Sequence, residues 1–142
     1  MKFLLCTLAF LGAVSSQASG SCPFPFGTEN FAVKVQEAIA SKKTCGEASD
    51  LAIACARGSS MDSQFVSAAM VPCEQRINAA SSEVQKIVSS TSDLCTKKYA
   101  KSQGTLAISE RAFCRLSVAQ MYDDLLSDAD DVDAEAGIEN LE

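Results

Sequence analysis

The 142-residue chain contains no histidine and no tryptophan, and it has only two tyrosines and three prolines. Histidine is the usual base that activates a serine nucleophile, so its absence removes the commonest arrangement for hydrolytic catalysis. No aromatic platform for sugar rings is evident either, because aromatic residues make up only 6% of the chain. We therefore expect a protein that is not an enzyme.

Long apolar runs are also scarce, and the one present extends from Phe3 to Val14. It has the length of the apolar part of a secretion signal and is shorter than the roughly 20 residues that span a bilayer. Small residues at Ser16 and Ala18 predict a signal peptide of residues 1–18, with cleavage after Gly20 or an uncleaved apolar helix as alternatives. We expect a secreted or periplasmic protein without a membrane span.

Cysteines are plentiful, and six of the seven lie outside the predicted signal, which contains Cys6. An even number in a small exported chain predicts three disulfides, with 15 possible pairings among which the sequence does not choose. The six are Cys22, Cys45, Cys55, Cys73, Cys95 and Cys114. Their spacing matches no zinc motif, so we expect neither a metal nor another cofactor. A lipid on Cys22 is the minority alternative, since it would leave five cysteines.

Charge is divided unevenly along the chain. Nine acidic residues and no Lys or Arg lie between Asp123 and Glu142, whereas Ser19 to Tyr122 holds eleven basic and nine acidic residues. Nucleic acid is not an expected partner, because phosphate contacts require a clustered basic surface. Residues 128–142 have too little apolar surface to fold alone, and we expect a disordered acidic tail. A calcium loop starting at Asp131 would place its glycine one position too late.

Residues 19–127 show helical spacing and no sustained strand alternation, which predicts an all-α, disulfide-bonded bundle of about five helices. The two prolines in Cys22–Gly27 predict an extended N-terminal arm before it. Thr28 is a candidate cap for a first helix of residues 29–41, and Thr44 begins a capping box for a second helix that Gly58 ends.

A third helix is expected to start near Asp62, and Pro72 either begins a new short helix or lies within one longer helix. The next helical stripe extends from Val84 to Tyr99. Ser109 is the candidate cap of the last helix. In that helix an inward-facing stripe is expected at Cys114, Val118, Met121 and Leu125.

Two sets of residues are candidates for binding. The first is a candidate cationic docking surface that consists of Lys97, Lys98, Lys101, Arg111 and Arg115. The alternatives for these residues are a solvated helix face or a surface on which the acidic tail docks. Candidate walls of an inter-helix cavity for a small apolar ligand are Phe24, Phe26, Phe31, Phe65 and Phe113, which otherwise fill the core.

The segment Cys95 to Leu126 contains two cysteines that flank a Gly104-Thr105 turn, with Tyr99, Tyr122 and Leu125 around them. In these features it resembles the C-terminal half of the LprI-type lysozyme inhibitor family, although the chain lacks the tryptophan of that family. The resemblance implies an exported helical protein that binds and inhibits a cationic, lysozyme-like cell-wall hydrolase. An acidic protein would meet such an enzyme through long-range attraction. The alternative function is a carrier of a small apolar ligand.

Overall fold

The computed structural model describes the backbone of residues 20–138 and the side chains of residues 20–129. The predicted signal, residues 1–18, lies outside this range. The described residues form five helices and no strand: α1 (Phe31–Ala40), α2 (Cys45–Cys55), α3 (Asp62–Ala79), α4 (Ser82–Lys98) and α5 (Thr105–Ile138). The predicted all-α fold is confirmed, and so is the number of helices.

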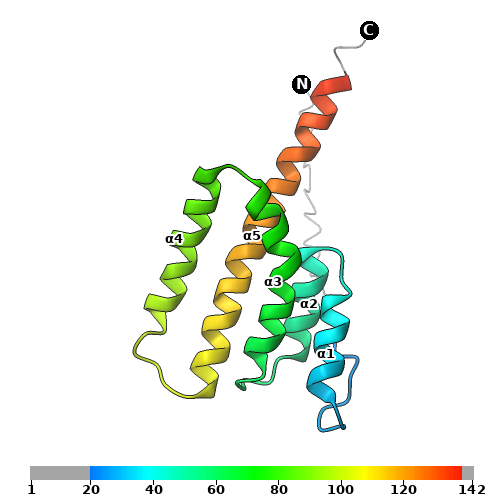
Figure 1. The fold of residues 1–142 in the computed structure, drawn as a ribbon, viewed down its shortest axis with the longest axis vertical. Helices are drawn as coiled ribbons and strands as arrows, with labels where there is room; N and C mark the ends of the chain where they lie inside the picture. Colours follow the sequence, from blue (N-terminus) through cyan, green and yellow to red (C-terminus); the bar gives the residue numbers. More distant parts are fainter. Residues whose placement is uncertain (1–19, 139–142) are drawn as a thin grey trace, which may run out of the picture.

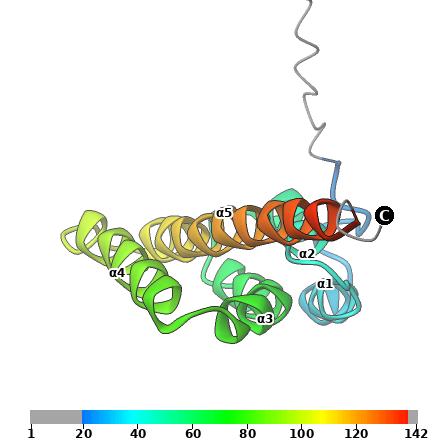
Figure 2. The same ribbon diagram turned by 90° about the horizontal axis from the view of Figure 1, so that it is seen from above.

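The helices form a bundle in which α3 is central (Figure 1). α3 packs against α1, α2 and α5, whereas α4 packs mainly along α5 and has little contact with α3. Seen from above, α4 and α1 lie at opposite ends of the bundle with α3 between them (Figure 2). The described part of α5 extends well past the other four helices at its C-terminal end (Figure 1).

Helical spacing places the apolar side chains of α1 and α3 in one core. Phe31, Val35 and Ile39 recur every four residues on α1, so they share one face, and all three are buried. The Phe31 ring meets the ring of the fully buried Phe65 edge-on, with 6.2 Å between the ring centroids. Full burial of a side chain of this size contributes about 1.5–3 kcal/mol.

Three disulfides join the elements of the bundle. Cys22–Cys55 ties the N-terminal arm to the end of α2, Cys45–Cys73 joins α2 to α3, and Cys95–Cys114 joins α4 to α5. The predicted framework is thus confirmed, and its pairing is one of the 15 that the sequence left open. The last bridge is the covalent link that holds α4, the least embedded helix, on the bundle.

Thr28 and Ser109 were assigned wrongly as helix caps, since Ser109 lies inside α5, which begins at Thr105, and the Thr44 cap is confirmed. The Thr44 side chain accepts a hydrogen bond of 3.2 Å from the Glu47 amide, as expected for an N-cap. Thr28 does not cap α1, because its hydroxyl donates to the Pro25 carbonyl within the preceding turn. Asn30, in the left-handed region at φ 60°, occupies the N-cap position of α1 instead.

Pro72 lies inside α3, so the single longer helix is the correct one of the two alternatives. An internal proline costs about 3 kcal/mol or more, because it removes a helical hydrogen bond. Packing on both sides of it offsets that cost. Ala69 precedes Pro72 and Cys73 follows it, both fully buried, and Cys73 is bonded to α2.

The buried face predicted for the last helix was partly wrong. Met121 is 47% exposed and Leu125 57% exposed, while Leu116 and Ala119 face the core at 1% each. Cys114 belongs to the side of α5 that meets α4, whereas the core residues belong to the side that meets α2 and α3. One apolar stripe drawn through Cys114 therefore missed the face against the core.

The acidic segment was expected to be a disordered tail, but α5 continues to Ile138, so its described residues 128–138 are helical, and residues 139–142 lie outside the described range. Between Thr105 and Ile138 the helix contains no proline, and its only glycine is Gly137. Extending a helix that packing has already nucleated costs little per residue, so the segment needs no buried surface of its own to be helical.

Candidate functional site

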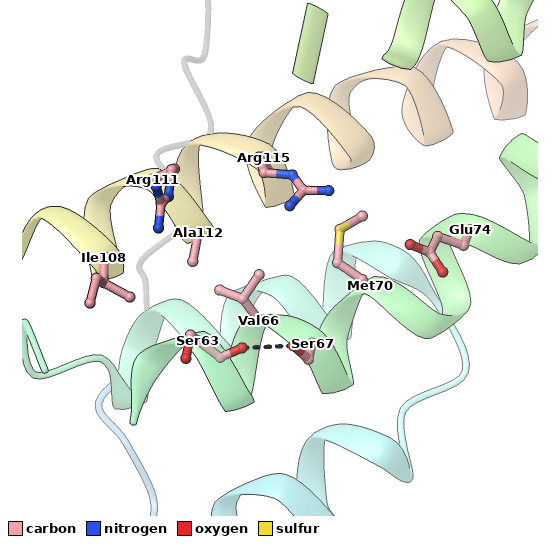
Figure 3. A pocket seen from close by; sticks show the side chains of 9 residues that line it. All are labelled: Ser63, Val66, Ser67, Met70, Glu74, Ile108, Arg111, Ala112 and Arg115. Carbon is pink, nitrogen blue, oxygen red and sulfur yellow. Dashed lines mark hydrogen bonds between the residues drawn. The ribbon is translucent and has the colours of Figure 1, made fainter. Parts of the chain in front are cut away.

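An open groove of about 340 Å³ lies between α3 and the first half of α5 (Figure 3). Its α3 side is formed by Ser63, Val66, Ser67, Met70 and Glu74, and its α5 side by Ile108, Arg111, Ala112 and Arg115. The volume is at the small end of the range of roughly 300–1,000 Å³ for small-molecule sites.

Two arginines dominate the charge of this groove. Arg111 and Arg115 are one helical turn apart, so they project from the same face of α5. Within the described part of the chain neither guanidinium group makes a hydrogen bond or an ion pair. Figure 3 shows both side chains over the space between the two helices, with Ile108 towards one end and Glu74 towards the other. The two arginines therefore make the middle of the groove cationic, whereas the floor of the groove is apolar.

Only two of the five predicted cationic residues line the groove. Arg111 and Arg115 line the groove, whereas Lys97 and Lys98 lie on the last turn of α4 and Lys101 on the turn after it, all three exposed. The Lys98 ammonium lies 5.2 Å from the centre of the Tyr99 ring.

The described part of the acidic tail, residues 128–138, does not fold back onto this surface. Asp128 belongs to the same continuous helix as Arg111, 17 residues further on, which places it about 25 Å away along the axis. An unbroken α5 therefore carries the acidic segment away from the arginines rather than back to them.

The five phenylalanines proposed as walls of a ligand cavity do not line the groove. Phe31 and Phe65 are buried in the core, and Phe24 and Phe113 pack partly buried against it. Phe26 is 64% exposed, with its ring 5.4 Å from that of Phe31. Filling and covering the core is thus their role in the described structure.

A buried polar cluster around Asp62 was missed in the sequence. Its carboxylate is fully buried and accepts hydrogen bonds from the amides of Arg57, Gly58 and Ser59 and from the hydroxyl of Ser109. These bonds hold the α2–α3 loop, where Gly58 has a φ of 69°. The spacing Ser59-x-x-Asp62 is that of a capping box, which is the signal that would have found it.

A second hollow of about 360 Å³ lies where the start of α2 meets α3 and α5. Its charges neutralise each other, since the Arg76 Nε lies 3.3 Å from the Asp123 Oδ1. Burial raises the pKa of Asp123 above its ordinary value of 3.8, and Asp124 adds to this, although the Arg76 guanidinium lowers it. Because its main charges are paired, this hollow is a weaker ligand site than the groove.

Among the described residues, no group of three or more Cys, Asp or Glu side chains is arranged to hold a metal ion. No helix in the same range is both long and apolar enough to cross a bilayer.

No protein-family model, curated protein or solved structure matches this chain. The resemblance to LprI-type inhibitors consequently stays a prediction.

Proposed function

We propose that the mature protein is an exported, non-enzymatic binding module for a cationic protein, with a lysozyme-like cell-wall hydrolase as its target. The observation that carries the proposal is the projecting end of α5. This helix continues about 17 Å past Ser127, and the chain from Asp123 to Glu142 has nine acidic residues and no basic one.

The C-terminal part of α5 from Asp123 onwards, here called the acidic arm, has charges of one sign only. Such a segment suits the capture of an oppositely charged protein. Charge complementarity accelerates encounter and selects the partner, and it acts over distances of about 8 Å at physiological salt. Exposed Met121 and Leu125 lie four residues apart on the described part of the same helix. They supply apolar contact area next to the acidic segment, as the core of a protein interface requires.

The test is binding and inhibition of purified lysozymes of several structural types by the mature protein. We expect affinity for a cationic lysozyme to fall as sodium chloride is raised. Four substitutions in the arm, Asp128→Asn, Asp130→Asn, Asp131→Asn and Asp133→Asn, are expected to slow association together by about tenfold or more.

A matched control separates the arm from net charge. Asp50→Asn, Glu83→Gln, Asp93→Asn and Glu110→Gln remove the same number of charges from exposed positions on the bundle. If both quadruple variants lose affinity equally, the arm is not the binding element. If every lysozyme type stays fully active and unbound at high excess of the protein, the lysozyme proposal is wrong.

A further inference from the structure

We propose that the groove between α3 and α5 binds a small organic acid with one apolar chain, whose carboxylate lies between Arg111 and Arg115. This inference concerns a different surface from the acidic arm and does not depend on the proposed function.

The charge of the ligand follows from the arginine pair. Two like charges four residues apart on a helix repel each other, and no described acidic side chain pairs with Arg111 or Arg115. An anion between them removes that repulsion. A carboxylate is suited to this position because the planar guanidinium group binds carboxylates through two parallel hydrogen bonds.

The apolar part of the ligand follows from the other walls. Val66 is 6% exposed, and Ala112 and Met70 are partly buried, so the floor of the groove is apolar. Ile108, still 38% exposed, lies beyond Arg111 (Figure 3). A bare inorganic anion would leave this surface in contact with water, whereas an alkyl chain would cover it at about 25 cal/mol per Å².

The direction of the ligand follows from the two ends. Glu74 bears a negative charge at one end and disfavours a carboxylate or an acidic chain there. The lining residues at the other end, Ile108 and Ser63, carry no charge (Figure 3). The chain therefore extends from the arginines towards Ile108, over Val66 and Ala112.

The size of the ligand follows from the volume. About 340 Å³ accommodates a small molecule, whereas a peptide helix would need a longer groove. The groove is also open to solvent along one side, so part of the ligand stays in water. We expect modest affinity and a preference for a chain of medium length.

The experiment uses octanoate as the probe, with amide chemical shifts of the mature protein as the readout. Octanoate is expected to shift amides of α3 and α5 around the groove. Octanol, which lacks the charge, and acetate, which lacks the chain, are each expected to bind at least about tenfold more weakly.

Two variants place the site. Arg111→Gln with Arg115→Gln is expected to weaken octanoate binding by about tenfold or more. The control Lys97→Gln with Lys98→Gln removes the same charge from α4, outside the groove, and is expected to leave the affinity unchanged. Ser67→Phe fills the groove from an exposed position and is expected to abolish binding while helical circular dichroism is retained.

The proposal is overturned if octanol binds as well as octanoate, if both double variants bind alike, or if no amide near the groove shifts at millimolar octanoate. Measurement of lysozyme binding by the double variant Arg111→Gln with Arg115→Gln distinguishes the two proposals. The arm is intact in that variant, so its lysozyme affinity is expected to be undiminished whether or not the groove binds octanoate.

Discussion

Ser109 and Asp62 are 47 residues apart in the sequence, and the Ser109 hydroxyl donates a 2.6 Å hydrogen bond to Oδ2 of Asp62. Both residues are buried, at 4% and 0% exposure. This bond joins α5 to the first residue of α3, and the same carboxylate accepts hydrogen bonds from three amides of the α2–α3 loop. It is therefore a point at which the bundle is expected to be sensitive to substitution.

Ser109→Ala is expected to lower the free energy of unfolding by about 2 kcal/mol, since it removes a hydrogen bond to a buried charge. Asp62→Ala is expected to cost about 3 kcal/mol or more, because the loop amides also lose their acceptor. Urea unfolding followed by circular dichroism measures both. Ser117→Ala, at an exposed position on the same helix, is the control, and an equal loss there would contradict the role of the bond.

Ser49→Ala is expected to stabilise the protein by up to about 1 kcal/mol. Ser49 is fully buried, and its hydroxyl has no hydrogen-bond partner among the described residues. An unsatisfied buried hydroxyl costs free energy that alanine does not. Ser89→Ala on the exposed side of α4 measures the gain from helix propensity alone, and the melting temperature of Ser49→Ala is expected to rise by more than that of this control.

Replacement of the Cys45–Cys73 pair by alanines is expected to destabilise the protein more than replacement of Cys95–Cys114. The sequence separations, 28 and 19 residues, predict about 3–4 kcal/mol from chain entropy for either bridge. Cys45 and Cys73 are also fully buried in the core, so their loss adds a packing cost.

Urea unfolding without reductant compares the two double variants. Equal losses of unfolding free energy would mean that the burial of Cys45 and Cys73 adds nothing to stability. Thiol titration of the denatured parent protein is the control. In the chain without residues 1–18 it is expected to find no free thiol, and peptide mapping is expected to recover the three pairs Cys22–Cys55, Cys45–Cys73 and Cys95–Cys114.

Asp123→Asn is expected to change stability in a pH-dependent way. Because burial raises the pKa of Asp123, the folded state binds this proton more readily than the unfolded state. The contribution of the protonated acid to stability is complete below pH 3.8 and is lost as the pH rises through the higher pKa of the folded state.

At neutral pH the uncharged Asn variant is therefore expected to be as stable as the parent or more stable. Any gain in the free energy of unfolding is expected to be at most about 1 kcal/mol, the scale of a partly exposed ion pair. The difference is expected to shrink as the pH falls towards 3.8. Melting temperatures between pH 3 and pH 7 measure it, with Asp93→Asn at an exposed position of α4 as the control. A parent protein that is clearly more stable at neutral pH would show that the Arg76 pair outweighs burial.

Removal of residues 130–142 is expected to shift the melting temperature by no more than about 2 °C, a change below 1 kcal/mol. α5 projects past the other helices there, and its last described ion pair with the bundle is that of Asp123 (Figure 1). A drop of many degrees would mean that the acidic segment packs on the bundle. The loss of helical signal in circular dichroism is expected to match residues 130–138.

Local signals in the sequence predicted the class of the fold and several helix boundaries. Thr44 with Glu47 marked the start of α2, because an N-cap needs only its own first turn. Phe31, Val35 and Ile39 recur every four residues, so the sequence places them on one face of a helix, and α1 buries that face in the core. The six cysteines outside the predicted signal predicted three disulfides, because that inference depends only on an even number of cysteines and not on their positions in space.

The tertiary structure decided what depends on contacts between distant segments. Ser109 has the local chemistry of an N-cap, yet its partner is Asp62, which only the packing of α5 on α3 brings within 2.6 Å. Met121 and Leu125 fit one helical stripe, but α5 meets α4 on one side and α2 and α3 on another, so periodicity alone did not select the face.

The candidate site was likewise predictable from the sequence only in part. The sequence identified Arg111 and Arg115 as cations, and a spacing of four residues already places them on one face of a helix. Only the packing of α5 against α3 set them over Val66 and Met70 in a groove and left Lys97, Lys98 and Lys101 outside it. Residue chemistry and helical period are local properties that the sequence determines, whereas disulfide pairing, the choice of face and the groove arise from contacts between helices that only the folded chain makes.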